Sequence, residues 1–303
     1  MNICYFLGSE SQADDWELRY SMRSWRANYL PFAAPPHLIP VVDPDCRRGR
    51  FIIIGHKPSW LSDTDTRVAH YPMPDPYRSN KDANLIQKLI FLVAKTGWDK
   101  GIICSDDQFL LRPAVDAEMT VPRHAGPISE FKRQKGHSWQ ERLWRTGEVL
   151  RKRKLTDFHY DTHIPHVVTR AQIMELLRWN YGEGNGYCVF SLLFNASGAV
   201  GERIDKSPIR AGLYGAEIKK HTITEKIGSN LFMSIDGDSL RCADLVRAIE
   251  AKWPEAAPWE LYPPTSPLDM KNLHPPKPVT PPPPMDASAQ SFEDFNYNQY
   301  LIS

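Results

Sequence analysis

Short apolar runs alternate with amphipathic stretches in residues 1–110, and this alternation constrains the fold more than any other feature of the chain. The predicted strands are 2–8, 37–43, 50–55 and 101–104, and the predicted helices are 16–30 and 80–97. Pro40 indicates an edge strand or a loop for the second run. The order strand–helix–strand–strand–helix–strand predicts an α/β domain with a mostly parallel sheet flanked by helices.

Glycine and polar residues follow three of these strands at the point where each strand ends. The three stretches are Gly8-Ser9, Gly55-His56 and Ser105-Asp106-Asp107. Ligands of open α/β sheets bind beyond the carboxyl ends of the strands. We therefore expect the three strand ends to share one cleft.

Two adjacent carboxylates, Asp106 and Asp107, stand between the apolar runs 101–104 and 109–111. Hard divalent cations take oxygen ligands and hold phosphates through a shared ion. The spelling alone is equally compatible with an Asx-turn that has no function. Because two unpaired charges between buried runs cost free energy unless something compensates them, we interpret the pair as a site for Mn²⁺ or Mg²⁺.

A second group of titratable residues, His159, Asp161, His163 and His166, falls within the stretch HYDTHIPHV. Imidazole and carboxylate groups together ligate metals or act as a general base. Three unrelated loop histidines are the alternative interpretation. We choose Asp161 and His163 as the catalytic candidates. A zinc site is the weaker interpretation, because no cysteine lies nearby and the spacing matches no zinc signature.

The two predicted helices carry candidates for ligand binding. Asn80, Lys81 and Asn84 begin the second helix, where free N–H groups and the positive end of the helix dipole favour a phosphate or a base edge. Ordinary capping explains Asn80 equally well. Arg19 belongs to a row of arginines along one face of the first helix, for which a solvated face is the alternative.

Charge is balanced over the whole chain but not along it. The formal net charge is +1, whereas residues 131–154 contain nine Lys or Arg and two Glu, a local charge of +7. The candidates for contact with a polyanion such as DNA are Lys132, Arg133, Lys135, Arg142, Arg145, Arg151, Lys152 and Arg153. A soluble helix is the alternative, but the density of charge favours an anion-binding face.

Cysteine usage and the N-terminus indicate the cellular compartment. Five widely spaced cysteines without a C-x-x-C pair favour free thiols and a reducing environment. The stretch MNICYFLGSES lacks the basic and apolar regions of a signal peptide, and no apolar run reaches the ~18 residues of a membrane span. We expect a cytoplasmic protein, located in a bacterial host if the chain is viral.

The C-terminal part differs in composition from the rest. Residues 254–284 contain twelve prolines, which favours an extended arm rather than a packed helix or sheet. We therefore expect a catalytic domain at 1–253, with 130–155 as a basic insertion, and a proline-rich tail at 254–303 that docks on a partner.

Five short blocks, taken in order, resemble a known family. They are DDWELRYSMRSW, IIIGHKPSWLSDTDTRVAHYP, NKDANLIQKLIF, GIICSDDQFLLRP and YDTHIPHVV, all within residues 1–180. This order resembles the Stealth-type sugar-phosphate transferases, which are similar in turn to the GT-A glycosyltransferases. The resemblance implies a GT-A-like (Rossmann-like) fold, in which an acidic motif holds a divalent metal on the diphosphate of a nucleotide-sugar, with a UDP-sugar as the expected donor.

The resemblance also implies metal ligands. Asp107 would be the principal ligand, and Asp106 would assist it or contact the ribose. His163 or His221 would complete the metal shell.

It further implies that Gly8 and Ser9 border the nucleotide and that Asp161 is the base. Two departures from the family weigh against sugar-phosphate transfer. The first strand reads CYFLGSES where the family usually has a Y-T-W-V-D-G signature, so an acidic residue expected there is missing. Ser105 stands where the family often has Asn.

These expectations predict a metal-dependent glycosyltransferase that moves a sugar from a nucleotide-sugar donor to a hydroxyl acceptor. The local charge of +7 favours DNA carrying hydroxymethylated bases, or another anionic acceptor such as a glycan. A Stealth-type hexose-1-phosphate transferase that builds a phosphodiester-linked surface polysaccharide is the alternative enzyme. A non-enzymatic binding protein whose proline-rich tail docks a partner is the third interpretation.

Overall fold

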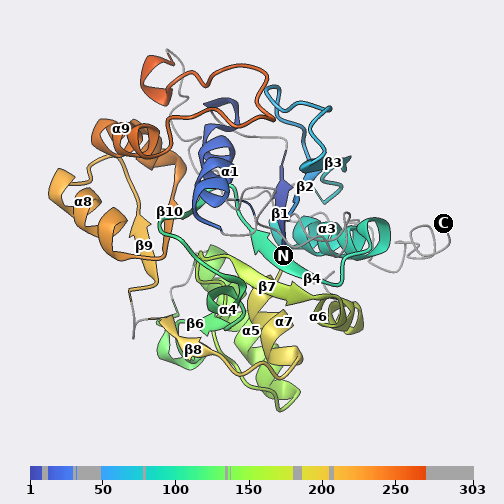
Figure 1. Cartoon of the computed structure of the whole chain (residues 1–303). Helices are drawn as coiled ribbons and strands as arrows, with labels where there is room; N and C mark the ends of the chain where they lie inside the picture. Colours follow the sequence, from blue (N-terminus) through green and yellow to red (C-terminus); the bar gives the residue numbers. More distant parts are fainter. Residues whose placement is uncertain are drawn as a thin grey trace.

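The structure is a computed structural model that describes residues 1–8, 13–29, 32, 49–77, 80–133, 136, 138–179, 186–204 and 208–270. It consists of a five-stranded sheet, a three-stranded sheet and the helices around them (Figure 1). The strand predicted at 37–43 and the part of the predicted tail beyond Met270 lie outside the described residues, as do Ser9 and Lys135.

The five-stranded sheet confirms the α/β prediction. Its spatial order is β3 (Val68–Pro72), β2 (Phe51–Gly55), β1 (Asn2–Leu7), β4 (Lys100–Cys104) and β7 (His166–Thr169). The first four strands are parallel to one another, and β7 is antiparallel to β4. Strands β1, β2 and β4 consist mostly of buried apolar residues, as is typical of parallel strands covered on both faces.

The three-stranded sheet has no counterpart among the predicted strands. It is built from β5 (Gln108–Leu110), β10 (Phe232–Ile235) and β9 (Arg210–Leu213), with β10 in the middle. β10 is antiparallel to β5 and parallel to β9. The Ile235 amide donates to the Asp107 carbonyl at 3.2 Å, so the carboxyl end of β10 meets the turn that follows β4. A short pair, β6 (Arg123–His124) and β8 (Glu202–Arg203), lies apart from both sheets.

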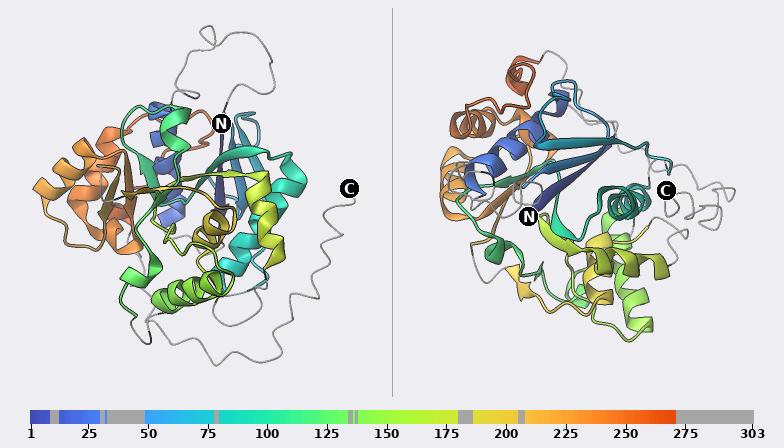
Figure 2. Two further views of the ribbon diagram at one scale, coloured as in Figure 1. Left: turned by 90° about the horizontal axis from the view of Figure 1, so that it is seen from below. Right: turned by 45° about the vertical axis from the view of Figure 1, so that its right-hand side comes forward.

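Helices cover the sheets in layers. They are α1 (Trp16–Asn28), α3 (Lys81–Thr96), α4 (Asp116–Met119), α5 (Ser138–Lys152), α6 (Arg170–Glu175), α7 (Val189–Ala196), α8 (Lys220–Ser229) and α9 (Ala243–Lys252). α3, α5, α6 and α7 pack on one face of the five-stranded sheet, and α1 packs between the two sheets. α8 and α9 pack on the three-stranded sheet, and Figure 2 shows them, in orange, at the opposite side of the molecule from α3, in teal.

Both predicted helices are confirmed as α1 and α3. The Asn80 side chain accepts a hydrogen bond from the Ala83 amide at 3.1 Å and so caps the start of α3. Gly97, with a φ of 66°, ends α3 in the left-handed conformation that glycine adopts most easily.

The chain continues into the core beyond the boundary predicted at residue 254. Residues 254–262, here called the C-terminal strap, cross α1 and carry Trp259, which is fully buried against Phe51. Glu260 pairs with Arg23 of α1 through two short contacts of 2.6 and 2.7 Å. Dense prolines predict extended backbone but do not prevent the aromatic residues between them from packing.

The segment predicted as a basic insertion, 130–155, also packs on the core. Its helix, α5, buries Leu143 and Leu150 completely in the same cluster as the five-stranded sheet. The basic residues of α5 lie on its other faces, and its apolar face forms part of the core.

Candidate functional site

The carboxylate pair lies where the sequence predicts it, at the carboxyl end of β4, an inner strand between β1 and β7. Ser105, Asp106 and Asp107 form the turn from β4 into β5. The Ser105 amide donates to the Gln108 side chain at 3.0 Å, and the Asp107 carbonyl accepts from the Ile235 amide, so residues of the three-stranded sheet hold this turn at the end of β4.

Tertiary packing brings three more acids to the pair. Together we call Asp15, Glu17, Asp106, Asp107 and Asp236 the carboxylate cluster. Burial raises the pKa of Asp107 to about 8, and the neighbouring charges of Asp106 and Asp236 add to the shift. Burial also raises the pKa of Asp106, and burial followed by repulsion from the pair raises that of Glu17 well above its usual range. In the absence of a cation, the negative charges of these neighbouring carboxylates repel one another and oppose their ionisation.

The chemistry of this cluster fits a divalent cation shared with a ligand. Asp107 Oδ1 is buried, and it accepts no hydrogen bond from the described residues. No described cation forms an ion pair with Asp106 or Asp107, although the charge of Lys81 at the start of α3 lowers the pKa of Asp106.

Within the described part of the chain, no three His, Cys, Asp or Glu residues are arranged as a complete metal shell. In Mg²⁺ sites one or two carboxylates commonly hold the ion together with substrate phosphates and water, so Asp106 and Asp107 are the residues that would hold such an ion. His221 is exposed on α8, and no described contact links it to the pair.

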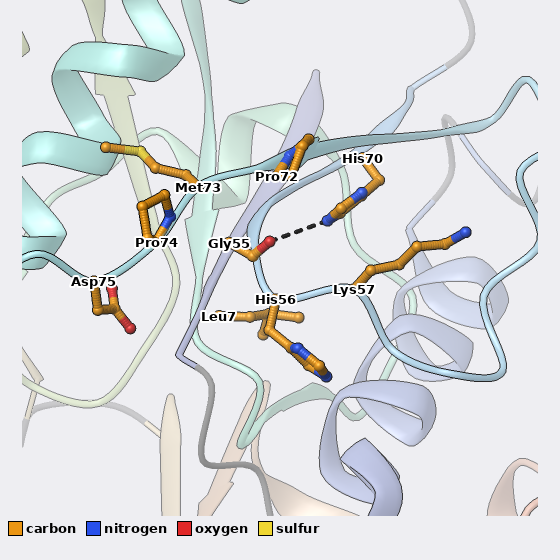
Figure 3. Close-up of a pocket in the computed structure, with 9 residues that line it drawn as sticks. All are labelled: Leu7, Gly55, His56, Lys57, His70, Pro72, Met73, Pro74 and Asp75. Carbon is orange, nitrogen blue, oxygen red and sulfur yellow. Dashed lines mark hydrogen bonds between the residues drawn. The ribbon is translucent and has the colours of Figure 1, made fainter.

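A pocket of about 400 Å³ lies at the carboxyl ends of β1, β2 and β3 (Figure 3). Its lining residue His56 places it beside the carboxylate cluster. His56 lines it, and its Nε2 is 4.0 Å from the Asp15 carboxylate. The Gly55 carbonyl contacts His70 Nε2 at 3.1 Å. Gly55 has a φ of 123°, and a Cβ there would lie 2.0 Å from the Leu7 carbonyl, so only glycine fits.

The sequence predicts only some of the residues that line this pocket. Gly55-His56 is predicted as a strand end, whereas His70 lies on β3, which is not among the predicted strands, and Asp75 follows β3. Asp75 pairs with the buried Lys88 at 2.5 Å, and Lys88 also donates to the Leu7 carbonyl at 2.7 Å. Gly8 lies beside this group, because a Cβ on it would be 3.4 Å from Asp75 Oδ2.

Two predicted ligand-binding residues have structural contacts instead. Arg19 is 1% exposed, donates to the Tyr262 carbonyl at 2.9 Å and lies over the Trp60 ring. Burial lowers its pKa. Asn84 is buried and its side-chain oxygen accepts from the Tyr77 amide at 3.0 Å. Lys81 remains exposed at the start of α3 and is the better ligand candidate.

The predicted catalytic pair separates into one structural and one surface residue. The Asp161 carboxylate accepts from the Ser191 amide at 2.8 Å, the Ser191 hydroxyl at 2.6 Å and the Phe190 amide at 3.3 Å, so it caps α7. His163 is exposed and has a φ of 52°. Desolvation and then the neighbouring charge of Arg210 lower its pKa, which favours a neutral imidazole at pH 7.

The other two histidines of the motif are buried. His159 packs against Phe131, and His166 packs against Phe190 and Phe194. Burial lowers the pKa of His166 to about 4. Both side chains therefore lie in the core of the domain.

Internal contacts use much of the basic segment. Arg142 pairs with Asp82 of α3, Arg151 with Asp157 and Arg133 with Glu148, and Arg153 lies over the Trp179 ring. Arg145 contacts the Gly186 carbonyl at 3.5 Å, while Lys132 and Lys152 are exposed. The described residues therefore present a weaker cationic face than the local charge of +7 predicts.

No known family model matches the chain, and no curated protein is significantly similar to it. Among the described helices, none combines the length and apolar character that crossing a membrane requires. An assignment of function therefore depends on the chemistry of the site.

Proposed function

We propose that the protein is a metal-dependent glycosyltransferase with a GT-A-like fold, which moves a sugar from a nucleotide-sugar to a hydroxyl acceptor. The observation that carries this proposal is the half-buried Asp106–Asp107 pair. It follows the inner strand β4, has no ion-pair partner among the described residues and includes the buried Asp107 Oδ1 atom. Ligands of such sheets bind at this edge.

Two groups of residues bind different parts of the nucleotide-sugar donor in this proposal. The pocket at the ends of β1–β3 has the size and position for the nucleoside, with His56 at its border to the carboxylates. Asp107 and Asp106 hold the divalent ion, and Lys81 adds positive charge beside them. When bound, Mn²⁺ or Mg²⁺ supplies the positive charge that stabilises the diphosphate leaving group.

His163, rather than Asp161, is the base in this proposal. It is exposed and neutral, whereas three hydrogen bonds commit Asp161 to α7. The acceptor oxygen bonds to the anomeric carbon of the sugar while the bond from that carbon to the diphosphate oxygen breaks. The hydroxyl proton passes to the imidazole, a transfer that typically contributes ~10²–10⁴-fold to the rate.

A thermal-shift screen of nucleotide-sugars, with and without Mn²⁺, tests the proposal. A donor at about 100 times its dissociation constant stabilises the native state by about 2.7 kcal/mol, so we expect Tm to rise by several degrees only when Mn²⁺ is present. Asp107→Asn should lose this response, whereas Asp244→Asn, an exposed carboxylate on α9, should keep it.

The proposal fails if no nucleotide-sugar raises Tm or if Asp107→Asn responds as the wild type does. Phosphorus analysis of the transferred product distinguishes sugar transfer from the Stealth-type alternative, because only hexose-1-phosphate transfer leaves phosphate in the product. A binding protein would show Mn²⁺-independent association and no turnover of any donor.

A further inference from the structure

A second group of functional side chains gathers over a glycine of the three-stranded sheet. Arg210 and Gly212 of β9, and Tyr214 directly after it, alternate onto one face of the strand. A Cβ on Gly212 would lie 2.6 Å from the Tyr214 ring and 3.2 Å from Arg210 Nη2. The guanidinium and the phenol therefore meet over Gly212, which is itself exposed.

His163 completes this group, which we call the cradle: Arg210, Gly212, Tyr214 and His163. The rings of His163 and Tyr214 lie 6.2 Å apart and are steeply inclined to each other. Arg210 Nη1 donates to the Thr162 carbonyl at 2.7 Å and so holds the loop that carries His163. His163 adopts a left-handed backbone conformation, which is uncommon for residues other than glycine and concentrates at functional sites.

Within the part of the chain that the structure describes, no carboxylate compensates the charge of the cradle. Arg210 forms no ion pair with any carboxylate of the described residues, in contrast to Arg142 and Arg151. It is half-buried, and one of its nitrogens is used by the Thr162 carbonyl. A guanidinium in this state retains donors in the planar arrangement that binds two oxygens of a phosphate together.

The cradle lies beside the carboxylate cluster. The Tyr214 hydroxyl is 2.6 Å from the Ser234 hydroxyl of β10, and the Gly215 amide donates to the Asp236 carboxylate at 3.0 Å. Asp236 follows Ile235, whose amide donates to the Asp107 carbonyl. A ligand in the cradle therefore lies at the same edge of the molecule as a donor held at the carboxylate pair.

We propose that the cradle binds a phosphate group of the acceptor, with Arg210 on the phosphate oxygens and the exposed Tyr214 ring against the adjoining sugar or base. The role as acceptor site rests on the proposed function, whereas phosphate binding at Arg210 does not. The phosphate could belong to a phosphorylated sugar or to a nucleotide, because both present the same oxyanion.

Calorimetric titration at low ionic strength tests this with two probes, glucose 6-phosphate and a 5′-phosphorylated thymidine dinucleotide. We expect at least one probe to bind the wild type, and Arg210→Gln to bind it about tenfold more weakly or worse. Arg210→Lys should fall between the two, because it retains charge without the planar arrangement of donors. Arg247→Gln, which removes an exposed charge on α9, should match the wild type.

Gly212→Ala provides a variant that removes no charge but displaces the side chains around it, because the new methyl group would lie 2.6 Å from the Tyr214 ring and 3.2 Å from Arg210 Nη2. It should weaken the same probe if Arg210 and Tyr214 hold it from their present positions, which keeps the test decisive should Arg210→Gln not fold. Tighter binding of the dinucleotide identifies a nucleic-acid acceptor, and tighter binding of glucose 6-phosphate identifies a phosphorylated glycan.

The proposal is overturned if neither probe binds the wild type at millimolar concentration, or if Arg210→Gln and Gly212→Ala bind as the wild type does. Stabilisation of the wild type by nucleotide-sugar and Mn²⁺ is measured separately. If the wild type binds phosphate but is not stabilised by any nucleotide-sugar with Mn²⁺, the transferase proposal alone is refuted. If it is stabilised by a nucleotide-sugar with Mn²⁺ but binds neither phosphate probe, the cradle proposal alone is refuted.

Discussion

Asp107 shows how a single residue opposes the stability of the free protein. Its folded pKa of about 8 lies far above the usual value of an aspartate. Between about pH 4 and pH 8 the unfolded chain releases this proton while the folded chain keeps it. The unfolded state is therefore favoured increasingly as the pH rises through this interval.

Asp107→Asn should accordingly be more stable than the wild type in the absence of metal, and the gain should be larger at pH 8 than at pH 5. We expect a gain of at least about 1 kcal/mol at pH 8, since one pKa unit corresponds to ~1.4 kcal/mol. Urea denaturation of both proteins at the two pH values measures it. A variant that is less stable than the wild type at both values would contradict this account.

His166 shows the opposite dependence. Its folded pKa of about 4 lies below the unfolded value, so the contribution to stability is complete above about pH 6.5 and is lost as the pH falls towards 4. His166→Phe cannot take up this proton, and its free energy of unfolding should fall less between pH 7 and pH 4, by about 3 kcal/mol. Equal losses in both proteins, measured by denaturant titration, would show that His166 is not buried in its neutral form.

Among the elements, α7 depends on a side chain from a distant loop. Asp161 binds the amides at the start of α7, where a negative charge also meets the positive end of the helix dipole. The residue types of the motif HYDTHIPHV predict a general base at Asp161. In the structure, the Asp161 carboxylate instead accepts hydrogen bonds at the start of α7.

Two substitutions of Asp161 separate these roles. Asp161→Ala should lower the free energy of unfolding by about 1–2 kcal/mol, whereas Asp161→Asn keeps an acceptor oxygen and should lose much less. Turnover of Asp161→Asn should remain close to that of the wild type. A folded Asp161→Asn protein without turnover would restore Asp161 as the base, with circular dichroism as the check on folding.

The elements also show where periodicity predicts structure and where it does not. α1 and α3 are predicted because their apolar residues recur with the helical period over three or more turns. β9 and β10 are four residues long, too short for a period to be recognised, and β3 carries exposed and half-buried residues beside prolines. The cradle on β9 was therefore not predictable, although His163 was singled out.

At the scale of the whole molecule, the C-terminal strap joins the end of the domain to α1. Glu260 is fully buried against Arg23, and the Tyr262 hydroxyl contacts Asp14, next to Asp15 of the carboxylate cluster. Removing one member of a buried ion pair typically costs about 3–5 kcal/mol, because the remaining charge loses its compensation.

A chain that ends at Met270 should therefore be much more stable than one that ends at Trp253. We expect the shorter chain to unfold at a Tm lower by many degrees, or not to fold, because it loses Trp259 from the core together with Glu260. Thermal melts followed by circular dichroism compare them, and Glu260→Gln in the longer chain isolates the ion pair. Equal Tm values for the two chains would restore a domain boundary at 254.

The sequence by itself determined the α/β class, the two long helices and the position of Asp106 and Asp107 after a buried strand. These follow from side-chain periodicity and from the burial of consecutive apolar residues, which are local properties of the chain. Only the tertiary structure decided which polar groups meet. Asp15, Glu17 and Asp236 join the pair, and Arg210 meets His163, because sheet order and helix packing bring distant segments together. No local pattern encodes those contacts, since each depends on how the layers pack.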